Sequence, residues 1–406
     1  ALLQTAYAPD DLEHWKQRWR EPPTAGDLEA ALTHYRQAFL LESEGPAFMQ
    51  DFELPAEARQ SAVLDLLIDA GSDSNRYFNK PADEPGFCES CLAQALLTLQ
   101  LNAPAGGRGV RTSVRGGGPL TTLLLPTDPQ ATLWQRLWLN VLPVDALAHP
   151  KLTAPSDVLP WLSPTRTSDG PNAQETQPQL DHRREAHQVH PLQAWWSMPR
   201  RIRVDGSTAS DGDCALCGSR SRRLIRHIRT RHGGTNYTGN WLHPLTPYSI
   251  DAKGEKPPIS AKVHLAGRGY RDWLGLVIGN DNQQPEAAFV VRHYNSKVKR
   301  PSVRLWCFGF SMSNMKALCW YDSILPIHSV PDDRLKPFTR AVKALLDVAD
   351  EAAKALQDHV RAVWNRSGAE PAVPQSFWQH SESLFYEQLR NLSQLHFEHD
   401  DELLSR

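Results

Sequence analysis

The sequence CESCLAQALLTLQLNAPAGGRGVRTSVRGGGPLTT, residues 88–122, contains a cysteine pair, an apolar run and a segment in which six glycines alternate with three arginines. Glycine permits backbone conformations with φ > 0 and close approach to a partner, and the amides of such turns form anion-binding concavities. Arg108, Arg111 and Arg115 add positive charge. The segment therefore favours contact with a phosphate backbone, and a flexible surface loop is the alternative interpretation.

Two nucleotide-binding motifs do not fit this segment. A P-loop needs GxxxxGK[ST] between a strand and a helix, and no Lys-Ser or Lys-Thr follows these glycines. A dinucleotide-binding fingerprint also fails, because Gly107-Arg108-Gly109 is not followed by the third glycine or by an evident acidic partner for a ribose.

Four of the six cysteines form two CxxC pairs, Cys88 with Cys91 and Cys214 with Cys217. Thiolates at this spacing can bind one tetrahedral Zn²⁺, which here would join two segments that lie far apart in the chain. A closed Cys₄ site leaves no coordination position for a catalytic water, so we predict structural zinc. Unliganded cysteines are the alternative, and disulfides are not expected in a cytosolic protein.

Composition predicts a soluble, cytoplasmic protein of two or three domains. The chain has 406 residues, 40% of them hydrophobic and 22% charged, and no apolar run is long enough to span a membrane. The formal net charge is −2, yet basic residues are clustered. Six arginines lie between Arg220 and Arg231, and a second group comprises Lys297, Lys299, Arg300 and Arg304. Beside a cysteine pair and a glycine-rich loop, such clusters favour nucleic acid over a merely solvated face.

Residue patterning predicts an α+β fold. Apolar spacing predicts helices at 28–41 and 61–71 and two long helices, one after Pro337 and one at 376–395. Short β segments are expected at 195–206, 287–294, 303–310 and 315–325. We therefore expect a large mixed domain with a Cys₄ zinc site over residues 1–328, followed by an incomplete helical bundle over 329–406. Residues 151–192, rich in Pro, Ser, Thr and Gln, are expected to form a mobile linker.

Two further loops are candidate contacts with nucleic acid. Tyr77 and Phe78 stand beside Asn79 and Lys80, where an aromatic ring can stack on a base or enter a duplex. The alternative is that both rings pack beneath the loop. The turn at 310–315 would present small polar groups and one apolar wedge, although an ordinary polar turn is the simpler interpretation.

Taken together, the motifs resemble the CasA family, the large subunits of type I-E CRISPR Cascade surveillance complexes. The motifs that carry the resemblance are PAFMQ at 46–50, NKP at 79–81, CESC, RGGGPLTT, the second CxxC, NWLHP at 240–244 and GFSMSNMKALCWY at 309–321. Their order and spacing cover nearly the whole chain. Family members begin further upstream and continue into a four-helix bundle, so the chain is expected to be partial.

The resemblance implies a subunit that is not an enzyme. Such subunits recognise the protospacer-adjacent motif (PAM) in double-stranded DNA through the minor groove and begin the unwinding that forms an R-loop. Their partners are the other subunits of the RNA-guided complex and a separate nuclease-helicase that they recruit. The guide RNA reads most of the target, so the protein needs only a short motif and backbone contacts.

Carried over by position, the resemblance assigns residues to four elements. The glycine loop contributes Gly106, Gly107 and Gly109, with Arg108 and Arg111 beside them. A second loop, Tyr77, Phe78, Asn79 and Lys80, contacts the PAM region and the complex. The wedge hairpin contributes Ser313, Asn314, Met315 and Lys316. His232 aligns with a motif-reading lysine, with Arg231 beside it.

Two positions depart from the family pattern. Asn314 stands where the wedge is often a longer glutamine, which puts the depth of insertion in doubt. Histidine is mostly neutral near pH 7, so His232 in place of lysine implies a different motif preference.

A metal-dependent HNH endonuclease is the competing hypothesis, because CALCG is followed by His232, Asn236 and His243. An HNH site requires a compact ββα-metal unit, and the distant second cysteine pair argues against it.

Overall fold

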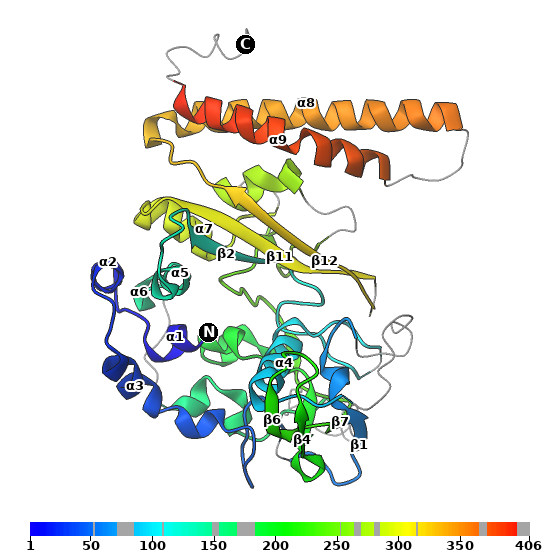
Figure 1. Cartoon of the computed structure of the whole chain (residues 1–406). Helices are drawn as coiled ribbons and strands as arrows, with labels where there is room; N and C mark the ends of the chain where they lie inside the picture. The colour runs from blue at the N-terminus through cyan, green and yellow to red at the C-terminus, as the bar shows by residue number, and fades with distance from the viewer. Residues whose placement is uncertain are drawn as a thin grey trace. The chain divides into compact units, whose positions relative to one another are not determined.

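The computed structural model describes residues 1–51, 53–70, 85–107, 109–147, 154–168, 183–251, 253–263, 269–279, 285–313, 316–364 and 372–395. The chain forms two compact units, each assembled from several stretches (Figure 1). Unit 1 comprises Ala1–Pro119, Val141–His243 and Met312–Cys319, and unit 2 comprises Leu120–Asn140, Pro244–Ser311 and Trp320–Arg406. The expected division into domains at residues 328 and 329 stays a prediction.

Two of the helices described in unit 1 begin with a side-chain cap. The helices of this unit are α1 (Leu2–Ala6), α2 (Leu12–Arg20), α3 (Ala25–Thr33), α4 (Glu89–Asn102) and α6 (Val144–Leu147). Asp11 caps α2 by accepting a hydrogen bond from the His14 amide at 2.8 Å, and Thr24 with Asp27 forms a capping box on α3. The helix expected at 28–41 is confirmed as far as Thr33, and a 3₁₀ turn at Arg36–Phe39 follows it.

Unit 1 contains three small sheets. Their strands are β1 (Arg59–Ala62), β3 (Arg183–Glu185), β4 (Arg201–Asp205), β5 (Ser210–Asp213), β6 (Arg220–Leu224), β7 (His227–Arg231) and β8 (Asn236–Thr238). The central sheet has the antiparallel order β1-β7-β4, β5 pairs with β6, and β3 runs parallel to β8. The strand expected at 195–206 is confirmed as β4.

The helix expected at 61–71 is wrong throughout its described part, residues 61–70. Ala62 ends β1 opposite His227, and a 3₁₀ turn follows at Val63–Leu66. The Val63 amide donates to the Arg226 carbonyl at 2.7 Å. Backbone hydrogen bonds to a strand distant in sequence thus replace the local helical ones, because tertiary pairing overrides a marginal helix propensity.

An aromatic cluster forms the core of unit 1. The ring centroid of Trp161 lies 5.3 Å from that of Phe48 and 5.7 Å from that of Trp196, and its indole Nε1 donates to the Ala38 carbonyl at 2.7 Å. Trp161 is completely buried, with Val158 and Leu159 just before it. These three side chains anchor the segment 154–168 in the core, and residues 183–192, which include β3 and the buried Leu192, are also part of the fold. The mobile linker expected at 151–192 is therefore wrong for both described parts, because apolar burial outweighs a polar composition.

Unit 2 is built on a three-stranded sheet of order β12-β11-β2. Its elements are β2 (Thr121–Pro126), α5 (Leu133–Trp138), β9 (Tyr248–Ser249), β10 (Ile259–Ser260), α7 (Phe289–His293), β11 (Val303–Ser313), β12 (Lys316–Pro326), α8 (Asp332–Trp364) and α9 (Ala372–Gln394). The end of β11 and the start of β12 fall within Met312–Cys319, which belongs to unit 1. β2 and β11 are antiparallel, with Cys307 opposite Thr122. The strands expected at 303–310 and 315–325 are confirmed.

The strand expected at 287–294 is wrong, because this segment forms α7. Val290 and Val291 are buried, and the Val290 amide donates to the Pro244 carbonyl at 3.1 Å. A short apolar run fits a buried helix as well as a strand, and here packing decides.

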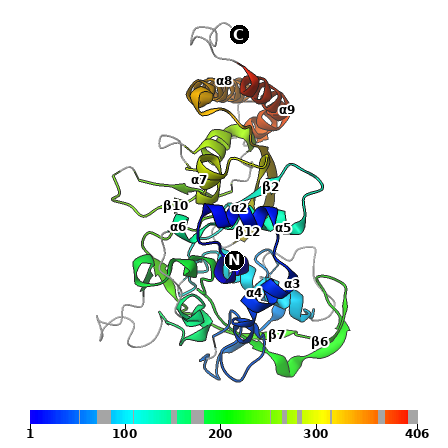
Figure 2. The ribbon, with the colours of Figure 1, turned by 90° about the vertical axis from the view of Figure 1, so that its left-hand side faces the viewer.

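Helices α8 and α9 confirm the two long helices expected at the end of the chain, although α8 begins at Asp332, so the expected start after Pro337 is wrong and Pro337 lies inside the helix. They lie side by side (Figures 1 and 2), and Phe338 of α8 and Phe385 of α9 pack against the buried ring of Trp273. The α+β class with C-terminal helices is thereby confirmed. Within the described ranges, no helix combines the length and apolar character needed to cross a membrane.

Candidate nucleic-acid interface and cysteine cluster

The two CxxC pairs meet in space, as their spacing predicted. The sulfur atoms of Cys88, Cys91, Cys214 and Cys217 all lie within 4.8 Å of one another. Cys88 Sγ and Cys217 Sγ are 3.8 Å apart. A tetrahedral Zn²⁺ with Zn–S bonds of about 2.3 Å separates its ligands by about 3.8 Å, so this donor set suits a metal of that size.

Local backbone structure holds each pair in place. Cys88 is the N-cap residue of α4, so both cysteines of the first pair lie in its first turn. The second pair occupies the turn between β5 and β6, where Gly218 has φ +71° and its amide donates to the Cys214 carbonyl at 2.9 Å. Phe87 and Ile225 exchange two backbone hydrogen bonds of 2.9 Å. These bonds join the two segments independently of any metal.

The environment of the cluster shifts the pKa values of two of its thiols in opposite directions. Hydrogen bonds from the side chain and backbone of Ser219 lower the pKa of Cys217 to about 6. Desolvation raises the pKa of Cys91 well above its usual value. A metal binds the thiolate form, so Cys217 is ready to coordinate while Cys91 has to release its proton.

The glycine loop follows α4 directly and folds back on itself. Gly107 and Gly109 adopt φ values of +85° and +78°, which only glycine adopts readily. At Gly106 an added Cβ would lie 2.0 Å from Val110 Cγ1. The loop therefore makes a tight turn with the positive φ values that the composition predicted, and its exposed Gly107 leaves the backbone bare at that point. Arg108 lies outside the described residues.

The glycine loop packs against the end of β7, where Arg231 and His232 lie. The Gly233 amide donates to the Gly109 carbonyl at 2.7 Å, and an added Cβ on Gly109 would lie 3.3 Å from the His232 Cβ. The structure thus brings together two elements that are more than 100 residues apart in the sequence, and both His232 and Arg231 are exposed there.

A cavity of about 820 Å³ opens beside this contact, entirely within unit 1. Gly106, Arg231 and His232 line it together. Four arginines and two carboxylates contribute to its wall, namely Arg59, Arg200, Arg201, Arg231, Glu57 and Asp65. Its charged residues are therefore predominantly basic, and apolar side chains such as Leu99 and Ile228 also line it.

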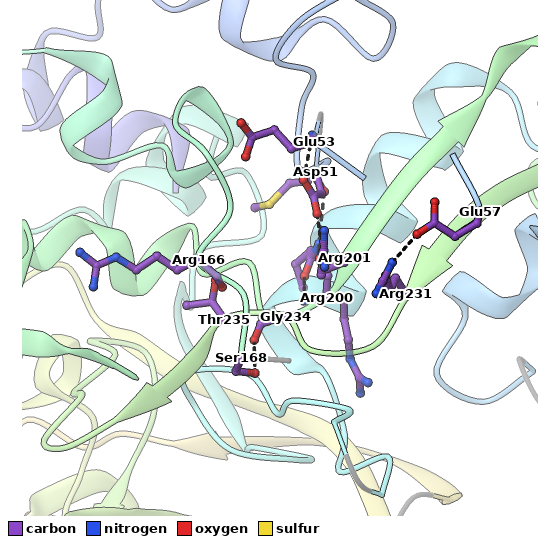
Figure 3. Close-up of polar contacts among 12 residues, drawn as sticks. Asp51, Glu53, Glu57, Arg166, Ser168, Arg200, Arg201, Arg231, Gly234 and Thr235 are labelled. Atoms are coloured by element: carbon purple, nitrogen blue, oxygen red, sulfur yellow. Dashed lines mark hydrogen bonds and ion pairs between the residues drawn. The ribbon is translucent and has the colours of Figure 1, made fainter. Parts of the chain in front are cut away.

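Two of these arginines form ion pairs with carboxylate side chains (Figure 3). Arg201 Nε lies 2.7 Å from Asp51 Oδ2, and both side chains are almost completely buried. Arg231 Nη1 lies 2.9 Å from Glu57 Oε1 at the exposed rim of the cavity. Arg231 is thus placed at the predicted site, but in an ion pair that the sequence did not indicate.

The other arginines of the glycine segment face inward. Arg111 Nε donates to Ser168 Oγ at 2.7 Å, and Ser168 Oγ donates to the Gly234 carbonyl at 2.7 Å (Figure 3). Arg111 therefore tethers the loop to the segment after β7. Arg115 is buried and donates to Asn102 Oδ1 at 3.3 Å, so the expectation that it adds charge to the loop surface is wrong.

The arginine-rich run at 220–231 is partly neutralised. Arg220 pairs with Asp211 at 3.1 Å, Arg223 with Glu42, and Arg231 with Glu57. The last two acids come from segments distant in the sequence, so the run is less basic than its composition indicates.

Several predicted site residues cannot be placed. Tyr77, Phe78, Asn79, Lys80, Asn314 and Met315 lie outside the described residues. Ser313 ends β11 and Lys316 begins β12, and both side chains are exposed at the end of this hairpin. Sequence reasoning missed Arg59, Arg200 and Arg201 as residues of the cavity. The consecutive arginines in PRRIRVD were the available signal.

The HNH hypothesis finds no support in the position of His243. This side chain is 3% exposed, and its ring lies 4.5 Å from that of Trp195. Burial lowers its pKa well below the usual value. A general base has to reach its substrate, and this histidine does not reach the surface.

Comparisons with known proteins agree with the motif-based resemblance. The family of the CRISPR-associated protein Cse1 matches residues 1–405. Thermus thermophilus CasA (Cse1) superposes with a TM-score of 0.63 at 17% identity, covering 97% of this chain and 81% of that one. Cse1 from Acidimicrobium ferrooxidans gives 0.62 at 14% identity, with 98% and 78% covered. A chain of a CRISPR RNA-guided surveillance complex gives 0.64 at 16% identity, with 93% and 74% covered.

Proposed function

The chain belongs to the CRISPR-associated Cse1 family, and from this premise we propose that it is the PAM-recognising large subunit of a type I-E Cascade complex. It binds the PAM in double-stranded DNA from the minor groove, starts unwinding and R-loop formation, and recruits a separate nuclease-helicase for antiviral defence. It works in the prokaryotic cytoplasm with the other subunits of the RNA-guided complex.

One observation carries this proposal: the bare backbone of the glycine loop packs against the strand end that bears Arg231 and His232, at the mouth of a basic cavity. Backbone amides and glycines without side chains can approach a minor groove closely. The minor groove presents a degenerate pattern of donors and acceptors, which suits tolerant reading of a short motif. Arginines beside the loop supply attraction to the phosphates.

The test uses the assembled complex with this subunit and a duplex that carries a matched target. Gly107→Asp places a negative charge in the loop, and Asn314→Ala shortens the residue assigned to the wedge. Both variants should weaken duplex binding and R-loop formation, while binding of the guide RNA stays unchanged. Duplex binding equal to that of the wild-type complex would refute the assigned sites.

We infer that the cysteine cluster holds structural Zn²⁺. Four sulfur ligands within 4.8 Å of one another supply the complete tetrahedral set of a closed structural site, which leaves no coordination position for catalytic water. The ion would add a second connection between α4 and the β5–β6 turn. Native mass spectrometry should find one zinc per chain, and Cys214→Ser should release it. A metal-free native protein would refute this inference.

We further propose that the chain is not an enzyme. The buried position of His243 disfavours the nuclease alternative. Incubation of the purified chain with plasmid DNA and Mg²⁺ should produce no nicking, and cleavage abolished by His243→Ala would overturn the proposal.

A further inference from the structure

Arg200 has no acidic partner among the described residues, although its side chain is half-buried. Arg201 pairs with Asp51 and Arg231 with Glu57 (Figure 3), and Arg59, which also has no ion pair among the described residues, is exposed to solvent. The hydrogen bond from the Arg200 side chain to the described residues runs from Nη2 to the Pro104 carbonyl at 2.5 Å. The guanidinium group offers five donors, so most of its capacity is unused.

The surroundings of Arg200 raise the free energy of its charged form by desolvation. Its Nε is buried without a hydrogen-bond partner. Desolvation lowers the pKa of Arg200 to about 10, so it stays protonated at neutral pH. The side chain is half-buried in the cavity wall, so part of the hydration of its charge is lost and no described carboxylate replaces it. An anion bound in the cavity would compensate this charge.

The backbone around Arg200 is built rigidly. Its amide donates to Gln100 Oε1 at 2.9 Å, and its carbonyl accepts from Gln100 Nε2 at 3.0 Å. Gln100 is itself completely buried on α4. One residue ahead, Pro199 lies so close to Gly234 that an added Cβ would be 1.9 Å from the Pro199 carbonyl oxygen. Arg200 is thus held at a fixed point of the cavity wall.

Its position also connects it to the glycine loop. Pro104, which accepts the hydrogen bond, precedes Gly106 by two residues, and Pro104, Gly106 and Arg200 all line the cavity. An anion bound by Arg200 would lie beside the bare backbone of the loop. Guanidinium groups bind phosphate oxygens through two parallel hydrogen bonds, which suits this setting.

We propose that Arg200 binds a phosphate group, namely a backbone phosphate of the nucleic acid that the glycine loop contacts. The proposal rests on the proposed function for its source of phosphate. The same chemistry would also take a free phosphate, and the experiment below separates the two sources.

The test compares Arg200→Gln with Arg203→Gln in the assembled complex. Arg203 is a matched control in β4: it is half-buried, donates to the Gly45 carbonyl at 3.0 Å, and desolvation lowers its pKa, but it does not line the cavity. Duplex affinity is measured over a range of salt concentrations. Losing one phosphate contact should reduce the slope of log K against log salt by about 0.9 and weaken binding by roughly tenfold or more.

Arg200→Gln should show both changes, and Arg203→Gln neither. Arg200→Lys should keep the salt slope, because it retains the charge, and lose only part of the affinity. An unchanged slope in Arg200→Gln, or equal losses in both glutamine variants, would overturn the assignment of a backbone phosphate while the proposed function still stands.

A second arm uses the isolated chain and inorganic phosphate, read by the midpoint of thermal unfolding. Phosphate should raise the unfolding midpoint of the wild type and of Arg203→Gln but not that of Arg200→Gln, and this result supports the phosphate site. The result would support the site even if the wild-type complex did not bind duplex and the proposed function were refuted. Such a rise without any effect of Arg200→Gln on duplex binding identifies free phosphate as the ligand and overturns the backbone assignment. No effect in either arm overturns the phosphate site itself.

Discussion

Replacing Gly109 by alanine tests whether the shape of the glycine loop matters for binding. Gly109 has φ +78°, and holding a residue with a Cβ in this region costs about 1–2 kcal/mol. The new Cβ would also lie 3.3 Å from the His232 Cβ, so that side chain has to shift. If the loop must keep its conformation to bind, duplex affinity should fall by roughly 5- to 30-fold.

The measurement is a duplex titration of the assembled complex, followed by fluorescence anisotropy. Gly254→Ala is the matched control: its φ is +67°, and nothing lies within 4 Å of the added Cβ. Both variants should lose a similar free energy of unfolding, but only Gly109→Ala should bind duplex more weakly. Wild-type affinity in Gly109→Ala, or equal weakening in both variants, would refute the reasoning.

Three further perturbations follow from the same region and its supports. Asp51→Asn removes the carboxylate that pairs with the buried Arg201, so urea denaturation should show the free energy of unfolding reduced by about 3–5 kcal/mol; a change below about 1 kcal/mol would contradict this. Glu57→Gln releases Arg231 from its ion pair and should raise duplex affinity by up to about fivefold, and weaker binding would speak against a DNA contact at Arg231. Burial lowers the pKa of His243 in the folded state, so its contribution to stability is complete above about pH 6.5 and is lost below it by up to about 1.4 kcal/mol per pH unit. Unfolding measured from pH 7 to 5 should show this slope in the wild type and a smaller one in His243→Gln; equal slopes would contradict it.

Short-range patterns were reliable where the chemistry depends on residue type and spacing. The CxxC pairs predicted a common cluster because thiolates at this spacing suit one metal, and their sulfurs do meet. The positive φ values of Gly107 and Gly109 follow from glycine itself. The 3.6-residue period predicted α8 because a long amphipathic helix has one face to bury.

Predictions failed where distant partners compete with local preference. Residues 61–66 form an edge strand and a 3₁₀ turn because β7 offers backbone hydrogen bonds, and residues 289–293 form α7 because packing selects a helix for an apolar run that fits both. Trp161 is buried, so the polar, proline-rich segment that contains it packs against the core, because tertiary contacts outweigh the local composition.

By itself, the sequence determined the two CxxC pairs, the glycines of the loop and the long helices, because each depends on residues close together in the chain. The meeting of the two CxxC pairs followed from thiolate chemistry, since four such ligands complete one tetrahedral site. Only the tertiary structure decided which arginines face a ligand. Asp51 and Glu57 neutralise Arg201 and Arg231 across 150 and 174 residues of chain, and Arg200, between the same elements, receives no acid among the described residues. Coulomb energy depends on separation in space, which the order of residues does not reveal.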